Sequence, residues 1–195
     1  MNPENEPNME KLSRTQVLVF MAVTALILLA ISQIWERLGK VSMIPVRFTP
    51  IAFIQGIVLA GLIIGASTIL TQVWPKYRIS AEKYLDFVIT PLAVPDLIWV
   101  GLLPGLSEEL LFRGVMIPAL GYDWFALIMS SVFFGVLHMN DRDSWHYAVW
   151  AIVIGFVLGY SAFATGNLLV PVIAHIFTNI CSSALWKFKQ SQIVS

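Results

Sequence analysis

The sequence contains few charged residues and no excess of either sign. Only 12% of its 195 residues are Asp, Glu, Lys or Arg, whereas about 25% is usual in soluble domains. By contrast, 57% of the residues are hydrophobic and the mean hydropathy is +0.77, so lipid is expected to surround most of the chain. The twelve basic and twelve acidic residues cancel. This balance leaves no strongly basic surface for a phosphate backbone and argues against nucleic acid as a partner.

Cysteine and histidine are also scarce. The single cysteine, Cys181, lies in an apolar segment, which excludes a disulfide within the chain. The three histidines are His138, His146 and His175. Any site that uses imidazole is therefore restricted to these three positions.

Long uncharged segments predict an all-α fold, a polytopic transmembrane helix bundle of about six to seven spans. One crossing takes roughly 20 apolar residues, and only helices and closed barrels satisfy every backbone group in lipid. The pairs Gly61 with Gly65 and Gly155 with Gly159 have the small-residue spacing that lets a neighbouring helix approach closely. The predicted apolar segments are residues 15–35, 48–75, 87–104 (interrupted by prolines), 105–121, 124–139, 146–165 and 168–186.

A polar stretch, residues 76–86, is the most plausible internal boundary of the chain. It separates an N-terminal anchor region of two spans, residues 1–86, from residues 87–186, which hold the polar groups at membrane depth. Residues 187–195 form a polar C-terminal tail. Any chemistry is therefore expected in the region 87–186.

Three charged residues fall on one otherwise apolar helix: Glu108, Glu109 and Arg113. A charge at the membrane centre costs about 2.5–3.5 kcal/mol on insertion scales, so each needs a physical reason. Glu109 and Arg113 are four residues apart with the acid first, which favours an ion pair on one helix face. Glu108 points about 100° away and is left over. Either it faces a wet cavity as a general base, or Arg113 holds both acids in a buried packing network.

Two of the histidines lie on other predicted helices together with a second ring or polar group. Phe134 precedes His138 by one turn, and Asn179 follows His175 by one turn on the same face. A single histidine in a membrane is commonly a link between helices, but two of them beside an unpaired glutamate favour a reactive site. His146, between Trp145 and Tyr147, is better explained as part of an interfacial aromatic belt.

These residues carry a family resemblance. The segments 108–113, 134–138 and 175–179 resemble the EExxxR, FxxxH and HxxxN motifs of the CAAX protease and bacteriocin-processing (CPBP, or Abi) superfamily, in the same order. That superfamily includes the type II CAAX prenyl endopeptidases. The resemblance covers roughly residues 86–186, about half of the chain, and identifies residues 87–186 as a CAAX protease (Abi)-like catalytic core.

The resemblance implies a role for each motif residue. Glu108 and His138 would activate a water molecule, and His175 and Asn179 would stabilise the oxyanion. Glu109, Arg113 and Phe134 would support the site. The spacing of His175 and Asn179 agrees with this, because side chains four residues apart on a helix can present two donors to one point.

A zinc site is the alternative use of the same groups. Two histidines and a carboxylate with a water molecule form a known open zinc site, so Glu108, His138 and His175 are candidate ligands. The metal-free arrangement, with no cofactor, is preferred, because a liganding Glu108 would leave only Glu109 as a base, and Glu109 would then have to leave Arg113.

The sequence therefore predicts an integral, multi-pass intramembrane endopeptidase that cleaves a lipidated or membrane-embedded peptide. The lipid bilayer, a peptide or protein substrate and further membrane proteins are the expected partners. A bacterial plasma membrane or a thylakoid or other plastid membrane is the expected location. The alternative function is a non-proteolytic membrane scaffold or assembly factor of the same family, in which the polar cluster only fixes helix packing.

Overall fold

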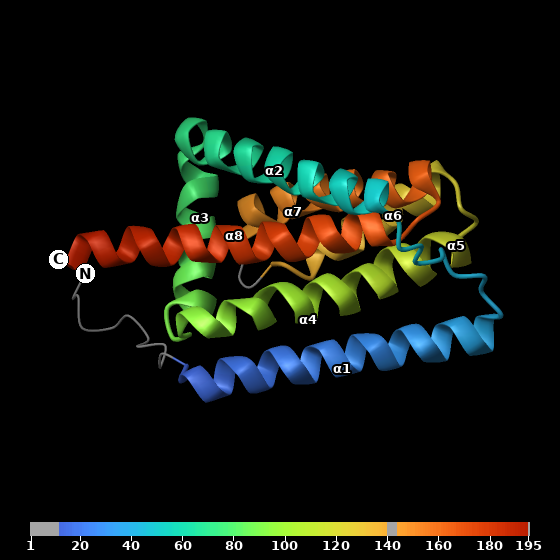
Figure 1. The fold of residues 1–195 in the computed structure, drawn as a ribbon, viewed down its shortest axis with the longest axis horizontal. Coiled ribbons are helices and arrows are strands. Elements are labelled where there is room, and N and C mark those ends of the chain that lie inside the picture. Colours follow the sequence, from blue (N-terminus) through green and yellow to red (C-terminus); the bar gives the residue numbers. More distant parts are fainter. Residues whose placement is uncertain (1–11, 140–143, 195) are drawn as a thin grey trace, which may run out of the picture.

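The computed structural model describes residues 12–139 and 144–194, and these residues form helices with no strand. The all-α fold is confirmed (Figure 1). The elements are α1 (Arg14–Gly39), α2 (Pro50–Val73), α3 (Pro75–Ile89), a 3₁₀ turn η2 (Val94–Asp96), α4 (Leu97–Glu109), a π-helix η3 (Leu110–Met116), α5 (Ile117–Ala119), α6 (Trp124–Val136), α7 (Trp145–Thr165) and α8 (Leu169–Val194).

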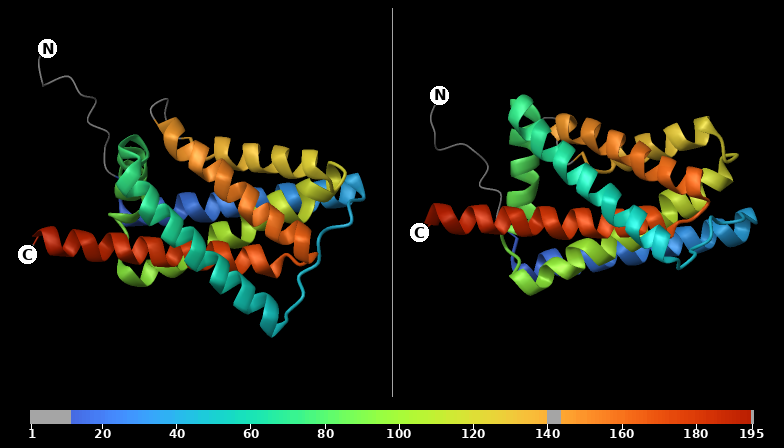
Figure 2. Two further views of the ribbon diagram at one scale, coloured as in Figure 1. Left: turned by 90° about the horizontal axis from the view of Figure 1, so that it is seen from above. Right: turned by 45° about the horizontal axis from the view of Figure 1, so that its top comes forward.

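Most of the long helices run lengthwise along the molecule, whereas α3 crosses them at one end (Figures 1 and 2). The bend between α3 and the helical stretch Val94–Ala119 measures 106°. α3 is also the most polar of the long helices, with Lys76, Arg78 and Glu82 among its residues. Its crosswise course therefore suits a helix that lies at the edge of an apolar bundle.

The number of spans is lower than expected. Four helices among the described residues are long and apolar enough to cross a membrane, or five if the bent pair counts as one span, and not six or seven. The prolines do not divide residues 87–121 into two crossings, because Val94–Ala119 runs on as one helical stretch with Pro104 inside α4. α6 has 13 residues, about 20 Å of helix, which is shorter than the bilayer core of about 30 Å.

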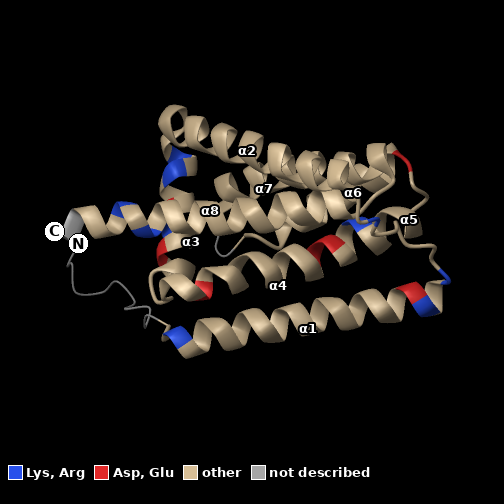
Figure 3. Cartoon of the chain, viewed as in Figure 1, with Lys and Arg blue, Asp and Glu red and all other residues tan. Residues whose placement is uncertain are grey.

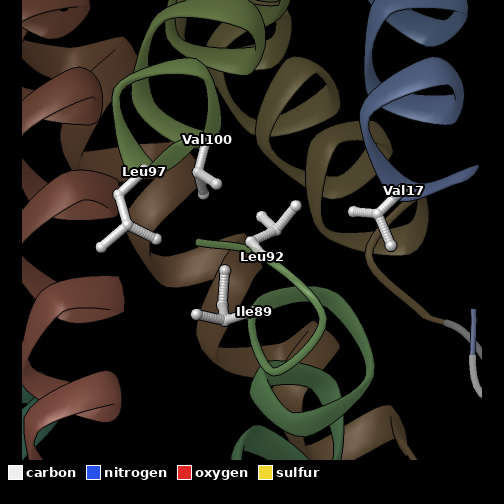
Figure 4. Close-up of a cluster of buried hydrophobic side chains, with 5 residues drawn as sticks. All are labelled: Val17, Ile89, Leu92, Leu97 and Val100. Carbon is white, nitrogen blue, oxygen red and sulfur yellow. The ribbon is translucent and has the colours of Figure 1, made fainter. Parts of the chain in front are cut away.

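The predicted anchor region packs directly on the predicted core. Its first eleven residues lie outside the described part of the chain. α1 contacts the start of α4 through a buried apolar cluster, and the guanidinium of Arg14 makes two hydrogen bonds, 2.6 and 2.7 Å, to the carboxylate of Asp96. The cluster consists of Val17, Ile89, Leu92, Leu97 and Val100 (Figure 4).

α2 packs along α8 at a glycine that the spacing argument did not select. A Cβ atom on Gly56 would lie 2.6 Å from Cβ of Ile173, so the two helices touch there. A Cβ atom on Gly61 or Gly65 would have no neighbour within 4 Å among the described residues. The close helix approach predicted at that pair is therefore wrong. At the other end, α8 continues to Val194, so most of the expected tail extends the last helix.

The second glycine pair behaves as predicted. A Cβ on Gly159 would lie 2.5 Å from Leu127, and one on Gly155 would lie 3.2 Å from Ser131 and Phe134 of α6. Gly135 faces α7 in turn, because its Cβ would lie 2.2 Å from Ile152. This close packing of α6 on α7 brings the end of α6, and with it His138, against the centre of the bundle.

Candidate active site

A cavity of about 1020 Å³ extends between α1, α2, α3, α4, α7 and α8. Glu108, His138, His175 and Asn179 all contribute to its wall, as expected from the sequence. Much of the remaining wall is apolar, with Phe20 and Met21 from α1 among its residues. The acidic segment of α4 lies partway along the bundle, away from the charged groups at its ends (Figure 3). The four side chains thus share one cavity, while their catalytic roles remain predictions.

Glu108 and His138 face each other across a short gap. The Nε2 atom of His138 lies 3.9 Å from Oε2 of Glu108, which is too long for a hydrogen bond. The Nδ1 atom of His138 lies 2.7 Å from the Phe134 carbonyl oxygen. Because a carbonyl only accepts, Nδ1 donates the proton of this bond, and in the tautomer that this bond selects Nε2 presents a lone pair. The Glu108 oxygen is buried and has no hydrogen-bond partner among the described residues.

Glu109 pairs with two side chains, Arg113 four residues later and His175 on α8. Its Oε1 atom accepts a hydrogen bond of 2.8 Å from Arg113, and both side chains are fully buried. The predicted pair is therefore confirmed. The same oxygen lies 2.7 Å from Nδ1 of His175 on α8, a contact that the spacing of residues could not indicate. Since a carboxylate only accepts, the proton of that bond sits on Nδ1 of His175.

Arg113 also contacts α6 and α7. One of its nitrogens donates to the Gly155 carbonyl at 3.0 Å, and its guanidinium carbon lies 4.3 Å from the centre of the Phe134 ring. That ring also contacts both catalytic candidates, with ring centres 4.6 Å from His138 and 5.9 Å from His175. Phe134 therefore forms a wall shared by the buried ion pair and the two imidazoles, in keeping with its expected supporting position.

A π-helix begins directly after the two glutamates. Residues 110–116 take this wider form, and Arg113 lies within it. The Ser130 hydroxyl on α6 donates a 2.8 Å hydrogen bond to the Phe112 carbonyl, so the widened turn gains a bond to a neighbouring helix. Short π segments are frequent at functional sites. The sequence analysis expected an ordinary helix here, because nothing in the residue pattern marks the change.

Asn179 is anchored beside Pro104. Proline has no N–H, so the Val100 carbonyl four residues earlier lacks its usual helical donor. The side-chain amide of Asn179 lies 3.4 Å from that carbonyl oxygen. The proline thus leaves an acceptor on α4 that orients an amide on α8 toward the cavity.

The donor atoms of the candidate zinc ligands suit a zinc ion chemically, but the positions of these ligands do not. Both imidazoles use Nδ1 for an oxygen acceptor, the usual outer contact of a metal-binding histidine. Yet no three His, Cys, Asp or Glu side chains in the described chain are gathered closely enough to hold a metal ion. Glu108, His138 and His175 do not form a three-ligand cluster, and no step below involves a metal.

Two tyrosines and the third histidine complete the surroundings. Tyr84 and Tyr147 line the cavity and stack on each other, with ring centres 4.9 Å apart. Neither tyrosine was predicted from the sequence to belong to the site. His146 does not line the cavity. It stacks on Trp145 at 3.8 Å and meets Trp74 edge-on at 5.6 Å, an aromatic setting that matches its expected non-catalytic role.

Several known proteins are similar to this chain. An uncharacterized protein of Bacillus subtilis, YpbD, is 27% identical over 134 residues, which are 69% of this chain and 68% of that one. An uncharacterized protein of Mycoplasma capricolum is 28% identical over 155 residues, covering 73% of this chain and 43% of the relative. CAAX prenyl protease 2 of Arabidopsis thaliana is 34% identical over 94 residues, or 38% and 30% of the two chains. No solved structure matches.

A family model agrees with these relatives and with the cavity. The model described as "Type II CAAX prenyl endopeptidase Rce1-like" matches residues 90–181. This range contains Glu108, His138, His175 and Asn179, which line the cavity, together with the buried pair behind them. Over residues 90–181, just under half of its length, the chain is therefore similar to the Rce1-like family of type II CAAX prenyl endopeptidases.

Proposed function

We propose that this chain is an intramembrane endopeptidase that hydrolyses a peptide bond in a lipidated or membrane-embedded substrate. The observation that carries the proposal is the facing pair of Glu108 and His138, two acceptors 3.9 Å apart on the wall of a largely apolar cavity. A water molecule that donates one hydrogen to each, at about 2.8 Å, would satisfy both. The lone pairs of that water then point away from the two acceptors, toward a bound peptide.

Glu108 acts in this proposal as the general base. The water oxygen attacks the scissile carbonyl carbon, one water proton passes to the Glu108 carboxylate, and the carbonyl becomes a tetrahedral oxyanion. When the C–N bond breaks, the same proton passes to the leaving amine. His138 holds the water through its Nε2 lone pair, which the Phe134 carbonyl keeps free by engaging Nδ1. General-base catalysis of this kind contributes about 10²–10⁴-fold to a rate.

His175 and Asn179 supply the donors for the oxyanion. To donate from Nε2 while Nδ1 faces Glu109, His175 must carry both ring protons and a positive charge. The buried Glu109 carboxylate, which also pairs with Arg113, accepts from the ring and stabilises that charge. Removing one oxyanion donor typically costs about 2.7–4 kcal/mol of transition-state stabilisation, so both residues are expected to matter strongly.

A scaffold function remains the second candidate, since the buried contacts of Glu109 with Arg113 and His175 would also lock helix packing. The relatives come from bacteria and from a plant, which fits a bacterial plasma membrane or a plastid membrane. The apolar wall of the cavity suits a lipidated peptide, and the family name supports a prenyl group as the lipid.

The test uses the full chain in proteoliposomes with a prenylated CAAX peptide that carries a fluorophore and a quencher. The wild type is expected to cleave it, and Glu108→Gln is expected to lower kcat by about 10²–10⁴-fold without loss of folded protein. His146→Gln, outside the cavity, serves as the matched control and should retain the wild-type rate. Equal cleavage by Glu108→Gln and wild type would overturn the proposal.

A further inference from the structure

Thr178 occupies the wall of the cavity between two proposed oxyanion donors. It follows His175 by three residues on α8 and precedes Asn179 by one, and all three line the same cavity. Yet its Oγ1 atom is buried and makes no hydrogen bond within the described chain. This hydroxyl has no part in the mechanism above.

The other helical hydroxyls of this protein show that a buried hydroxyl without a hydrogen bond is unusual. A Ser or Thr in a helix commonly donates to the carbonyl four residues earlier. Ser32, Thr68, Ser107, Ser131 and Thr165 do so in this chain, at distances between 2.6 and 2.8 Å. Thr178 lies in the middle of a helix like these residues but does not make that bond. Its hydroxyl is therefore left available for a different partner.

An orphan hydroxyl destabilises a folded protein, since its bonds to water are lost on burial and are not replaced. Valine has nearly the same shape as threonine and would remove this penalty. Oγ1 and Cγ2 share one carbon atom, so a rotation of about 120° about the Cα–Cβ bond brings Oγ1 to the position that Cγ2 held. The hydroxyl can thus turn toward the cavity when an acceptor arrives there.

The arriving acceptor has a defined chemistry. An extended peptide in an apolar cavity carries carbonyl oxygens that need donors, because no bulk water is present to satisfy them. Side chains three apart on a helix surface are about 5–6 Å from one another, which is one to two peptide units of an extended chain. Successive carbonyls of an extended chain point to opposite sides, so a donor at Thr178 meets a nearby carbonyl that points the same way as the one held by His175 and Asn179.

We infer that Thr178 is a substrate-binding residue whose hydroxyl donates a hydrogen bond to a main-chain carbonyl beside the scissile bond. This inference rests on the proposed function. The contact exists before and during the reaction alike, so its loss raises KM and leaves kcat nearly unchanged. The same hydroxyl has no hydrogen-bond partner among the residues that the structure describes, so its loss is not expected to lower stability.

The experiment compares Thr178→Val and Thr178→Ser in the proteoliposome assay with the prenylated fluorogenic peptide. We expect Thr178→Val to raise KM by about 3- to 10-fold, the effect of one neutral hydrogen bond, with kcat within about twofold and an unfolding temperature at or above that of the wild type. Thr178→Ser should restore KM. Thr165→Val is the control, because it removes a helical hydroxyl outside the cavity and should leave KM unchanged.

A binding measurement separates this inference from the proposed function. Anisotropy of the same peptide, labelled with the fluorophore alone, is followed with Glu108→Gln and with the double variant Glu108→Gln/Thr178→Val, neither of which needs to turn over. Weaker binding by the double variant supports the role of Thr178 whether or not the wild type cleaves. An active wild type with unchanged KM and binding in the valine variants overturns the inference alone. A wild type that neither cleaves nor binds overturns both proposals.

Discussion

The Nδ1 atom of His175 and the Oε1 atom of Glu109 lie 2.7 Å apart and join two helices, although the two residues are 66 positions apart in the chain. The same oxygen receives Arg113 at 2.8 Å. One carboxylate oxygen therefore holds a cation behind the cavity and an imidazole on its wall. Any change in the buried ion pair will reach the proposed oxyanion donor through this shared atom.

Arg113→Ala should destabilise the protein strongly. It leaves Glu109 buried without its charged partner, and breaking a buried pair in this way typically costs about 3–5 kcal/mol. Thermal unfolding in detergent and the amount of folded protein in membranes measure the effect. Lys189→Ala is the matched control, since Lys189 also pairs with a carboxylate, that of Glu82, but the two side chains are 63% and 40% exposed, and exposed pairs are worth about 0–1 kcal/mol. Similar losses for the two variants would contradict the argument.

Glu108→Gln should unfold at the same temperature as the wild type or a higher one. The Glu108 carboxylate oxygen is buried without a hydrogen-bond partner in the described chain. Replacing a charge there by a neutral amide of similar size removes a desolvation penalty. Thermal unfolding of the two proteins side by side is the measurement. A clear drop in unfolding temperature would mean that the carboxylate is a structural group, as in the scaffold hypothesis.

Metal chelators should leave cleavage unchanged. In the metal-free arrangement the proton passes through Glu108 alone and the imidazoles hold the water and the oxyanion, and the described chain gathers no three-ligand cluster. Cleavage rates are compared after incubation with 1,10-phenanthroline and after incubation with its non-chelating 1,7 isomer. Loss of activity with the chelator only, followed by recovery with added zinc, would favour the zinc alternative at Glu108, His138 and His175.

Gly135→Ala should destabilise the packing of α6 on α7. Its new Cβ would lie 2.2 Å from Ile152 Cγ1 and 2.7 Å from the Ile152 backbone nitrogen, and such overpacking typically costs about 1–3 kcal/mol. The end of α6 should shift, so cleavage should fall as well through His138. Gly65→Ala is the control, because no described atom lies within 4 Å of its Cβ. An unfolding temperature of Gly135→Ala equal to that of the control would refute the packing argument.

Contacts within one helix were predictable from the sequence, whereas contacts between helices were predictable only in part, as at Gly155 and Gly159. The spacing of Glu109 and Arg113 is enough to define their pair, because the geometry of a helix turn is known in advance. The pairing of Glu109 with His175 depends on how α4 faces α8, which no local pattern records. For the same reason Gly61 and Gly65 suggested a helix contact that Gly56 makes instead.

Backbone irregularities were the hardest features to anticipate. Prolines predicted a break near residue 104, but α4 continues because a side chain on another helix approaches the carbonyl that proline leaves free. The π-helix at residues 110–116 likewise involves the Ser130 hydroxyl of α6. Both depend on a partner that is distant in sequence. The identity of the four cavity residues was still available, because unpaired polar groups in apolar segments are few.

Because α3 crosses one end of the bundle, the distance of Glu108 from the start of α4 measures how far the site lies from that end. Eleven residues separate Glu108 from Leu97 at the start of α4, which is about 16 Å along the helix axis and about half the thickness of the hydrocarbon core. Each hydrolysed bond consumes one water molecule. For an endopeptidase at this depth, water becomes a second substrate that must be delivered through the same cavity as the peptide. Turnover then depends on how much room the bound lipid and peptide leave for water.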